Sequence, residues 1–173
     1  MTLHEHAVHH GSDKGKVHKY CDFYESRIGE PKRIIEFGIL NGASLKMWRD
    51  RYRDAVVIGL DIVDTKAPDG CYTFKIDASK PNWITKLEAQ FDLILDDASH
   101  MVVDQISSFE LWWPLVAKGG HYVIEDCHTM HYSQYNPAGI DFKRWVESLN
   151  IKHEYYIRVP GDESDSMTLI LYK

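Results

Sequence analysis

Cysteine and long apolar runs are scarce in this sequence. The three cysteines, Cys21, Cys71 and Cys127, are widely spaced and form no C-x-x-C pair, which disfavours both a disulfide framework and a zinc knuckle. No apolar segment approaches the roughly 18 residues that a membrane span requires, and the polar start is not typical of a signal peptide. We therefore expect reduced thiols in a cytoplasmic protein without a membrane partner.

An excess of positive charge is also missing. Lys and Arg number 20 against 26 Asp and Glu, a net charge of −6, which disfavours nucleic acid as the main partner. The length of 173 residues, 44% of them hydrophobic, predicts a single domain over 1–173. A homo-oligomer stays open, because Trp112 and Trp113 fit an interface as well as a core.

Histidine is abundant by contrast, with ten residues in the chain and five among the first eighteen. This abundance suggests a metal protein. We find no metal-site spacing in the N-terminal group, and we expect a polar, unstructured start there. That group comprises His4, His6, His9 and His10.

Apolar runs and helical spacing alternate along the chain, which predicts an α/β fold. The expected strands cover 33–37, 55–60, 72–76, 91–95, 121–124, 153–159 and 166–172. The expected helices cover 12–28, 42–53, 82–89, 103–115 and 142–149. The sheet should be mostly parallel, with a C-terminal antiparallel hairpin formed by the last two strands.

Acidic residues follow five successive predicted strands. They lie in 36–42, at Asp61, at Asp77, in 96–100 and in 125–128. Ligands of open α/β sheets bind beyond the carboxyl ends of the strands. The sequence therefore predicts a binding site at this edge of the sheet.

A glycine-rich loop follows the first predicted strand and opens a helix. Its pattern is E-x-G-x-x-x-G, from Glu36 through Gly38 to Gly42, and Asp61 lies nineteen residues further on. Glycines allow a close backbone approach to a ligand, and an acid at the second strand can accept both hydroxyls of a ribose. Loop and acid suggest a nucleoside cofactor, with a structural turn as the alternative.

Two acidic pairs end the fourth and fifth strands. Asp96-Asp97 and Glu125-Asp126 offer only oxygen ligands, which suit Mg²⁺, Mn²⁺ or Ca²⁺. Solvated loop ends are the alternative. His100 lies close behind Asp97 and is a candidate general base beside a bound metal, unless it is a hydrogen-bonded turn residue.

The order of the glycine loop, Asp61 and Ile76-Asp77 resembles the class I S-adenosylmethionine-dependent methyltransferases. Longer stretches between residues 11 and 129 are similar to the metal-dependent sugar O-methyltransferases of macrolide biosynthesis and to the rhamnosyl O-methyltransferase and cephalosporin hydroxylase group. They are GSDKG, IIEFGILNGASLKMWRDRY, FDLILDDASHM and KGGHYVIEDCHT. The resemblance implies a Rossmann-like class I methyltransferase fold, in which 1–30 form a helical cap over the cofactor site.

The resemblance also implies the cofactors and the roles of individual residues. S-adenosylmethionine would be bound by Glu36, Gly38, Gly42, Ser44, Asp61, Asp77, Ala78 and Asp96. Mg²⁺ or Mn²⁺ would be held by Asp97, Glu125 and Asp126, and His100 would be the catalytic base. The implied acceptor is a hydroxyl group of a sugar-containing small molecule or glycan.

The chain also differs from the macrolide enzymes, which are longer. Here 128–141 is the only sizeable insertion that could cover a substrate.

Three alternative functions stay open. They are an iron-dependent oxygenase built on His100, His128 and Asp97, a cofactor-binding module without catalysis, and a catechol-type methyltransferase.

Overall fold

The computed structural model describes residues 1–80 and 89–173. Their strands form one seven-stranded sheet in the order β3-β2-β1-β4-β5-β7-β6. The strands are β1 Arg33–Phe37, β2 Val56–Asp61, β3 Cys71–Lys75, β4 Phe91–Asp96, β5 Val116–Ile124, β6 His153–Ile157 and β7 Met167–Tyr172. The first five pair in parallel, and β7 pairs antiparallel with both β5 and β6. The predicted α/β sheet and its antiparallel hairpin are confirmed.

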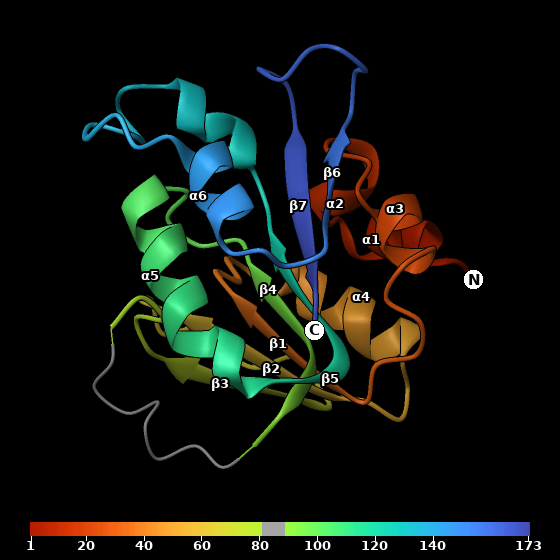
Figure 1. Cartoon of the computed structure of the whole chain (residues 1–173). Coiled ribbons are helices and arrows are strands. Elements are labelled where there is room, and N and C mark those ends of the chain that lie inside the picture. Colours follow the sequence, from red (N-terminus) through yellow and green to blue (C-terminus); the bar gives the residue numbers. More distant parts are fainter. Residues whose placement is uncertain (81–88) are drawn as a thin grey trace.

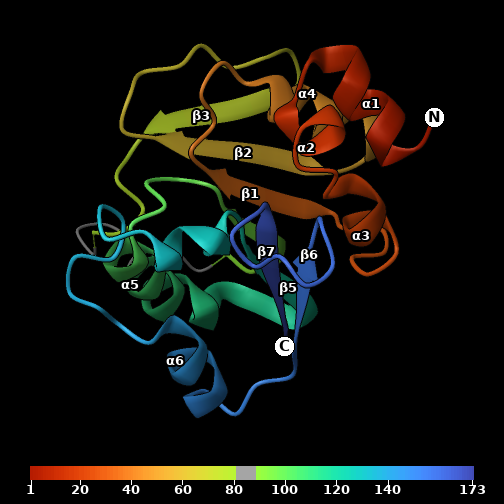
Figure 2. The same ribbon diagram turned by 90° about the horizontal axis from the view of Figure 1, so that it is seen from above.

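Helices cover both faces of the sheet (Figures 1 and 2). The α-helices are α1 Leu3–His10, α2 Asp13–Lys16, α3 Cys21–Glu25, α4 Ala43–Arg51, α5 Val102–Trp112 and α6 Phe142–Ser148. Two 3₁₀ turns follow α5 and β5, at η2 Trp113–Leu115 and η3 Cys127–His131. None of the described helices is long and apolar enough to span a membrane.

Two apolar clusters hold these layers together, one on each face. Successive strand residues point to opposite faces, so Ile34 packs with α1, α3 and α4, whereas Ile35 packs with α5 and α6. Trp48 anchors the first cluster and Trp112 the second, and both are fully buried. Trp112 is therefore a core residue and not part of an exposed interface.

The N-terminal segment differs from the prediction in two ways. Its start is a helix, because the side chain of Thr2 accepts a hydrogen bond from the Glu5 amide while Glu5 reaches back to the Thr2 amide, a capping box. The single helix expected over 12–28 is instead the two short helices α2 and α3, because the backbone between them enters the left-handed region at Lys19, whose φ is 59°. The helix expected over 82–89 lies outside the described residues except at its last position.

Candidate active site

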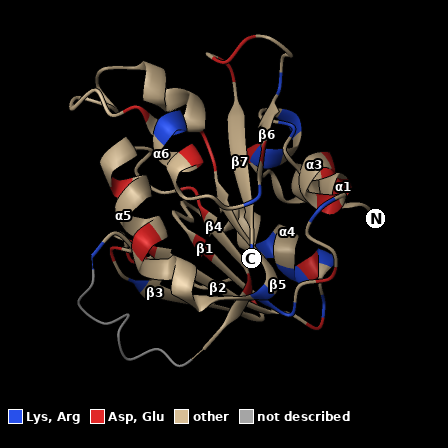
Figure 3. Ribbon diagram, viewed as in Figure 1, with Lys and Arg blue, Asp and Glu red and all other residues tan. Residues whose placement is uncertain are grey.

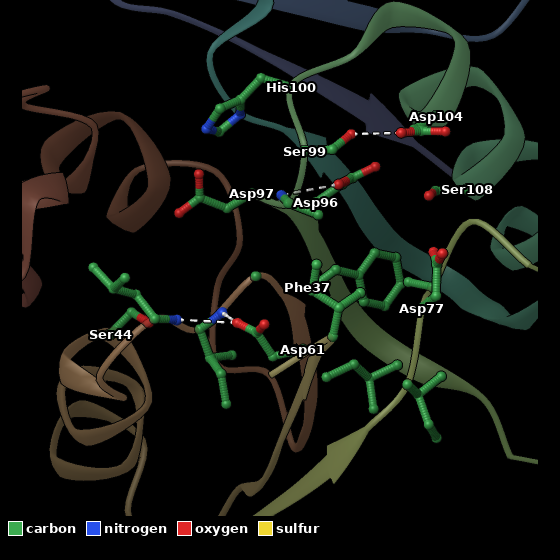
Figure 4. Close-up of a pocket in the computed structure, with 18 of the residues that line it drawn as sticks. Phe37, Ser44, Asp61, Asp77, Asp96, Asp97, Ser99, His100, Asp104 and Ser108 are labelled. Atoms are coloured by element: carbon green, nitrogen blue, oxygen red, sulfur yellow. Dashed lines mark hydrogen bonds between the residues drawn. The ribbon is translucent and has the colours of Figure 1, made fainter. Parts of the chain in front are cut away.

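A cavity of about 690 Å³ opens at the carboxyl ends of the parallel strands. Most of the residues predicted to bind the cofactor line it. They are Gly38, Ser44, Asp61, Asp77, Ala78 and Asp96, joined by Asp97 and His100 (Figure 4). The predicted residues Glu36, Gly42, Glu125 and Asp126 are not among the described residues that line the cavity.

The glycine loop forms one wall of the cavity and is held by Asp61. Gly38 has a φ of 76°, and a Cβ atom there would lie 2.1 Å from the carbonyl oxygen of Asp97, so this position requires glycine. One carboxylate oxygen of Asp61, Oδ2, accepts hydrogen bonds from the amides of Ile39 and Leu40 at 2.9 and 3.2 Å. Asp61 thus fixes the loop against the end of β2.

Asp96 and Asp97 point to different sides of the end of β4 (Figure 4), as expected for neighbouring residues at a strand end. Asp96 lies on the side of Ser108 and Asp104, and its Oδ1 accepts a hydrogen bond from the amide of Ala98 at 3.3 Å. Burial raises the pKa of Asp96 to about 7, so its carboxyl group is partly protonated near neutral pH. Its buried Oδ2 has no hydrogen-bond partner among the described residues.

Asp97 faces a buried ammonium group, that of Lys14. Nζ of Lys14 lies 2.5 Å from Asp97 Oδ2, 2.9 Å from Glu125 Oε2 and 3.2 Å from Glu36 Oε1. The Lys14 side chain is only 1% exposed. Burial alone would lower its pKa, but the three carboxylates raise the pKa of Lys14 well above its ordinary value. Lys14 therefore stays charged and neutralises part of a buried acidic cluster.

Glu36 and Glu125 are each held by a second donor from the helical layer. Trp48 Nε1 donates to Glu36 Oε2 at 3.0 Å, and the Tyr24 hydroxyl donates to Glu125 Oε1 at 2.8 Å. Burial raises the pKa of both glutamates, with Lys14 opposing the rise. Both oxygens of Glu125 are thus engaged by protein donors in this structure.

Asp126 lies next to His100 and Asp97 at the mouth of the cluster. The His100 Nε2 atom is 3.7 Å from Asp126 Oδ2, and the Tyr20 hydroxyl donates to Asp126 Oδ1 at 2.8 Å. Asp97, His100 and Asp126 each offer a ligand atom within 4.8 Å of the others. This set differs from the iron triad of His100, His128 and Asp97, which is not among the metal-capable groups of the described residues.

Lys14, Tyr20 and Tyr24 are site residues whose roles the sequence prediction missed. Lys14 and Tyr20 lie in or next to the GSDKG stretch, so the resemblance pointed to the segment without assigning its side chains. No local pattern marks Tyr24, because its contact with Glu125 joins residues 101 positions apart.

No protein-family model matches the chain. The 8-demethyl-8-α-L-rhamnosyl tetracenomycin-C 2′-O-methyltransferase of Streptomyces olivaceus is 30% identical over 155 residues, covering 80% of this chain and 41% of that enzyme. The L-olivosyl-oleandolide 3-O-methyltransferase of Streptomyces antibioticus is 32% identical over 151 residues, covering 77% and 39%. The chain is a homologue of these sugar O-methyltransferases. It spans about two fifths of the length of these curated relatives.

Solved structures show the same fold in this homologous group. The MycE methyltransferase from the mycinamycin biosynthetic pathway, in complex with Mg, SAH and mycinamycin VI, superposes with a TM-score of 0.82. The match covers 99% of this chain and 54% of MycE at 20% identity. The Rossmann-like methyltransferase fold that the sequence predicts for this chain is therefore confirmed.

Proposed function

We propose that this chain transfers the methyl group of S-adenosylmethionine to a sugar hydroxyl of a glycosylated small molecule or glycan, with help from a divalent cation. The observation that carries the proposal is the meeting of Asp97, His100 and Asp126 beside a cavity walled by the glycine loop. The names of the curated relatives, which methylate rhamnosyl and olivosyl groups, supply the class of acceptor.

The cavity suits the proposed methyl donor. In this proposal the glycine loop holds the methionine part, Asp61 and its neighbours hold the ribose, and Asp77 and Ala78 lie by the adenine. The unpartnered Oδ2 of Asp96 is a buried polar atom that a bound cofactor would satisfy. Glu36, by contrast, is proposed to act through Lys14 and Trp48 rather than by touching the cofactor.

The proposed cation site uses the carboxylates of Asp97 and Asp126, which are ligands typical of Mg²⁺ or Mn²⁺. Glu125 is the third proposed ligand. Each of its oxygens already accepts one hydrogen bond, from Lys14 or from Tyr24, and keeps a second lone pair that could face the cation. When bound, the cation supplies Lewis acidity and S-adenosylmethionine supplies the electrophilic methyl group.

His100 is the proposed general base. Its Nε2 would take the proton of the acceptor hydroxyl, whose oxygen could then accept the methyl group that S-adenosylmethionine, when bound, would supply with its sulfur as the leaving group. The imidazolium that forms is 3.7 Å from Asp126 Oδ2, a distance at which the carboxylate stabilises the added charge. The remaining work of the site is to align the hydroxyl with the methyl group.

The proposal is tested by incubating the protein with labelled S-adenosylmethionine, Mg²⁺ and a rhamnosylated aromatic polyketide, and following methyl transfer. His100→Ala should lower kcat by roughly 10²–10⁴ while the calorimetric affinity for S-adenosylmethionine is kept. His131→Ala, at an exposed position, is the matched control and should leave kcat unchanged.

Two results would count against the proposal. Equal turnover of His100→Ala and wild type would remove His100 as the base. A calorimetric titration in which S-adenosylmethionine does not bind the wild-type protein would reject methyl transfer altogether.

A further inference from the structure

A second group of metal-ligating side chains lies between α1 and α4, which are side by side in both views (Figures 1 and 2). His6 and His10 are four residues apart on α1, a spacing that puts both imidazoles on one face of a helix. Asp50 comes from α4. Each of the three offers a ligand atom within 4.8 Å of the other two.

The imidazole of His10 has a hydrogen-bond partner, and one buried nitrogen of the His6 imidazole has none within the described part of the chain. Nε2 of His10 is 2.7 Å from Asp50 Oδ2, whereas the buried Nδ1 of His6 has no hydrogen-bond partner among the described residues. The His6 residue is only 8% exposed. A buried polar atom without a partner is costly, and a metal ion bound to Nδ1 of His6 would remove that cost.

We propose that His6, His10 and Asp50 form a site for a transition metal ion of the Zn²⁺ type, separate from the proposed active site and independent of the proposed function. Two imidazole nitrogens and one carboxylate oxygen are typical Zn²⁺ ligands, and paired histidines at i and i+4 of one helix are a common way to present them. Three protein ligands leave the fourth tetrahedral position to water.

The geometry requires small side-chain adjustments. Ligand atoms about 2.0–2.1 Å from a tetrahedral zinc lie about 3.3 Å apart, so the 2.7 Å contact between His10 and Asp50 opens slightly as a metal replaces the shared proton.

A nearby cation does not block the site, because its charge is already matched. Arg51 Nε lies 2.7 Å from Glu25 Oε1, and Arg51 Nη2 lies 3.1 Å from Glu30 Oε1. Figure 3 shows basic and acidic stretches side by side along α4. A metal at this place would cross-link α1 to α4. It would thereby fix the turn between α1 and α2, and Lys14 is part of α2.

The test uses Co²⁺ as a spectroscopic substitute for Zn²⁺, added to the full chain in excess Mg²⁺, which competes for the carboxylates of the group formed by Asp97, His100 and Asp126. Any Co²⁺ that still binds at that group does so in every variant, so the difference between variants reports the site between α1 and α4. We expect wild-type protein to bind Co²⁺ with the visible absorption of tetrahedral nitrogen–oxygen coordination and with a raised Tm. His10→Gln and Asp50→Asn should each weaken binding at least tenfold and abolish the rise in Tm. Both changes are at partly exposed side chains, 16% and 51%, so the fold should survive.

His4→Gln is the matched control, because His4 lies on the opposite side of α1 at 100° per residue, and it should bind Co²⁺ like wild type. Equal Co²⁺ affinity and spectra for wild type, His10→Gln and Asp50→Asn would overturn the proposal. Neither outcome depends on methyl transfer, so this test and that of the proposed function can fail separately.

Discussion

Two clusters of titratable side chains illustrate opposite ways of placing charge in this fold. At the strand ends, Glu36, Asp97 and Glu125 surround Lys14, whose side chain is 1% exposed. Between α1 and α4, His10 and Asp50 form a pair whose carboxylate is 51% exposed. Water compensates much of the charge in the second cluster, whereas the first depends on donors that the protein supplies.

The difference predicts how each cluster responds to substitution. A buried charge that loses its partner has no solvent to replace it, so the cost is large. An exposed pair exchanges its partner for water at little cost. The strand-end cluster should therefore be fragile and the helix cluster tolerant, unless a metal is bound.

Lys14→Met should have the largest effect. Removing the ammonium leaves three carboxylates near one another without their cation, and we expect the free energy of unfolding to fall by about 3–5 kcal/mol. Urea denaturation of the protein in EDTA measures this loss. Lys16→Met, at an exposed position of the same helix α2, is the control and should change stability little.

The loss caused by Lys14→Met should also depend on pH. The pKa values of Glu36 and Glu125 are already raised, and without Lys14 they rise further. A group whose pKa is higher in the folded state stabilises the fold at low pH and loses that contribution as pH rises. The deficit should therefore be larger at pH 8 than at pH 5, and a deficit that grows toward low pH would contradict this account of the cluster.

The sequence predicted the edge of the sheet better than it predicted the side chains that complete the site. Strand ends follow from local apolar runs that stop at Gly38, Asp61 and Asp96, so the sequence alone places the cavity at this edge of the sheet. The position of Lys14 depends on how the N-terminal helices pack over β1 and β4. That packing is a long-range property, and the break between α2 and α3 at Lys19, a lysine with a positive φ, has no strong local signal.

The N-terminal histidines show the same limit from the other direction. The i, i+4 spacing of His6 and His10 is a metal-ligand spacing only where the segment is helical, and the sequence analysis expects an unstructured start without a metal-site spacing. The capping box of Thr2 and Glu5 was a local signal for a helix. Asp50 lies near the two histidines only because α1 packs on α4. The third ligand of the proposed site therefore cannot be predicted from the N-terminal segment alone.

Gly38→Ala sharpens the comparison by testing backbone packing at the strand ends. Gly38 and Gly29 both have a positive φ, 76° and 62°, but a Cβ at Gly29 would meet nothing within 4 Å. Both substitutions carry the same conformational strain, so their difference isolates the overlap with Asp97. We expect Gly38→Ala to be less stable than Gly29→Ala by about 1–3 kcal/mol, measured by urea denaturation. Equal stability would mean that the end of β4 moves freely away from the loop.

Tyr20→Phe removes the hydrogen bond to Asp126 and should have a smaller effect on the proposed cation site. Donors that orient metal-binding carboxylates typically contribute 10–100-fold in affinity, and we expect the Kd for Mn²⁺ to rise about tenfold. Tyr132→Phe, whose exposed hydroxyl donates to the carbonyl of Ser164, is the control. The same Mn²⁺ affinity for both variants would show that Tyr20 does not position Asp126.

Asp50→Asn in metal-free protein should have the smallest effect, a loss below about 1 kcal/mol. The hydrogen bond with His10 lowers the pKa of Asp50. A carboxyl group with a lowered pKa in the folded state stabilises the fold above its unfolded pKa, so the small deficit should vanish as pH falls well below about 4. Asp54→Asn, in an exposed pair with Lys32, is the control measured by the same denaturation. A loss in Asp50→Asn as large as that of Lys14→Met would erase the contrast between the clusters, because it would mean that exposure does not protect the helix pair.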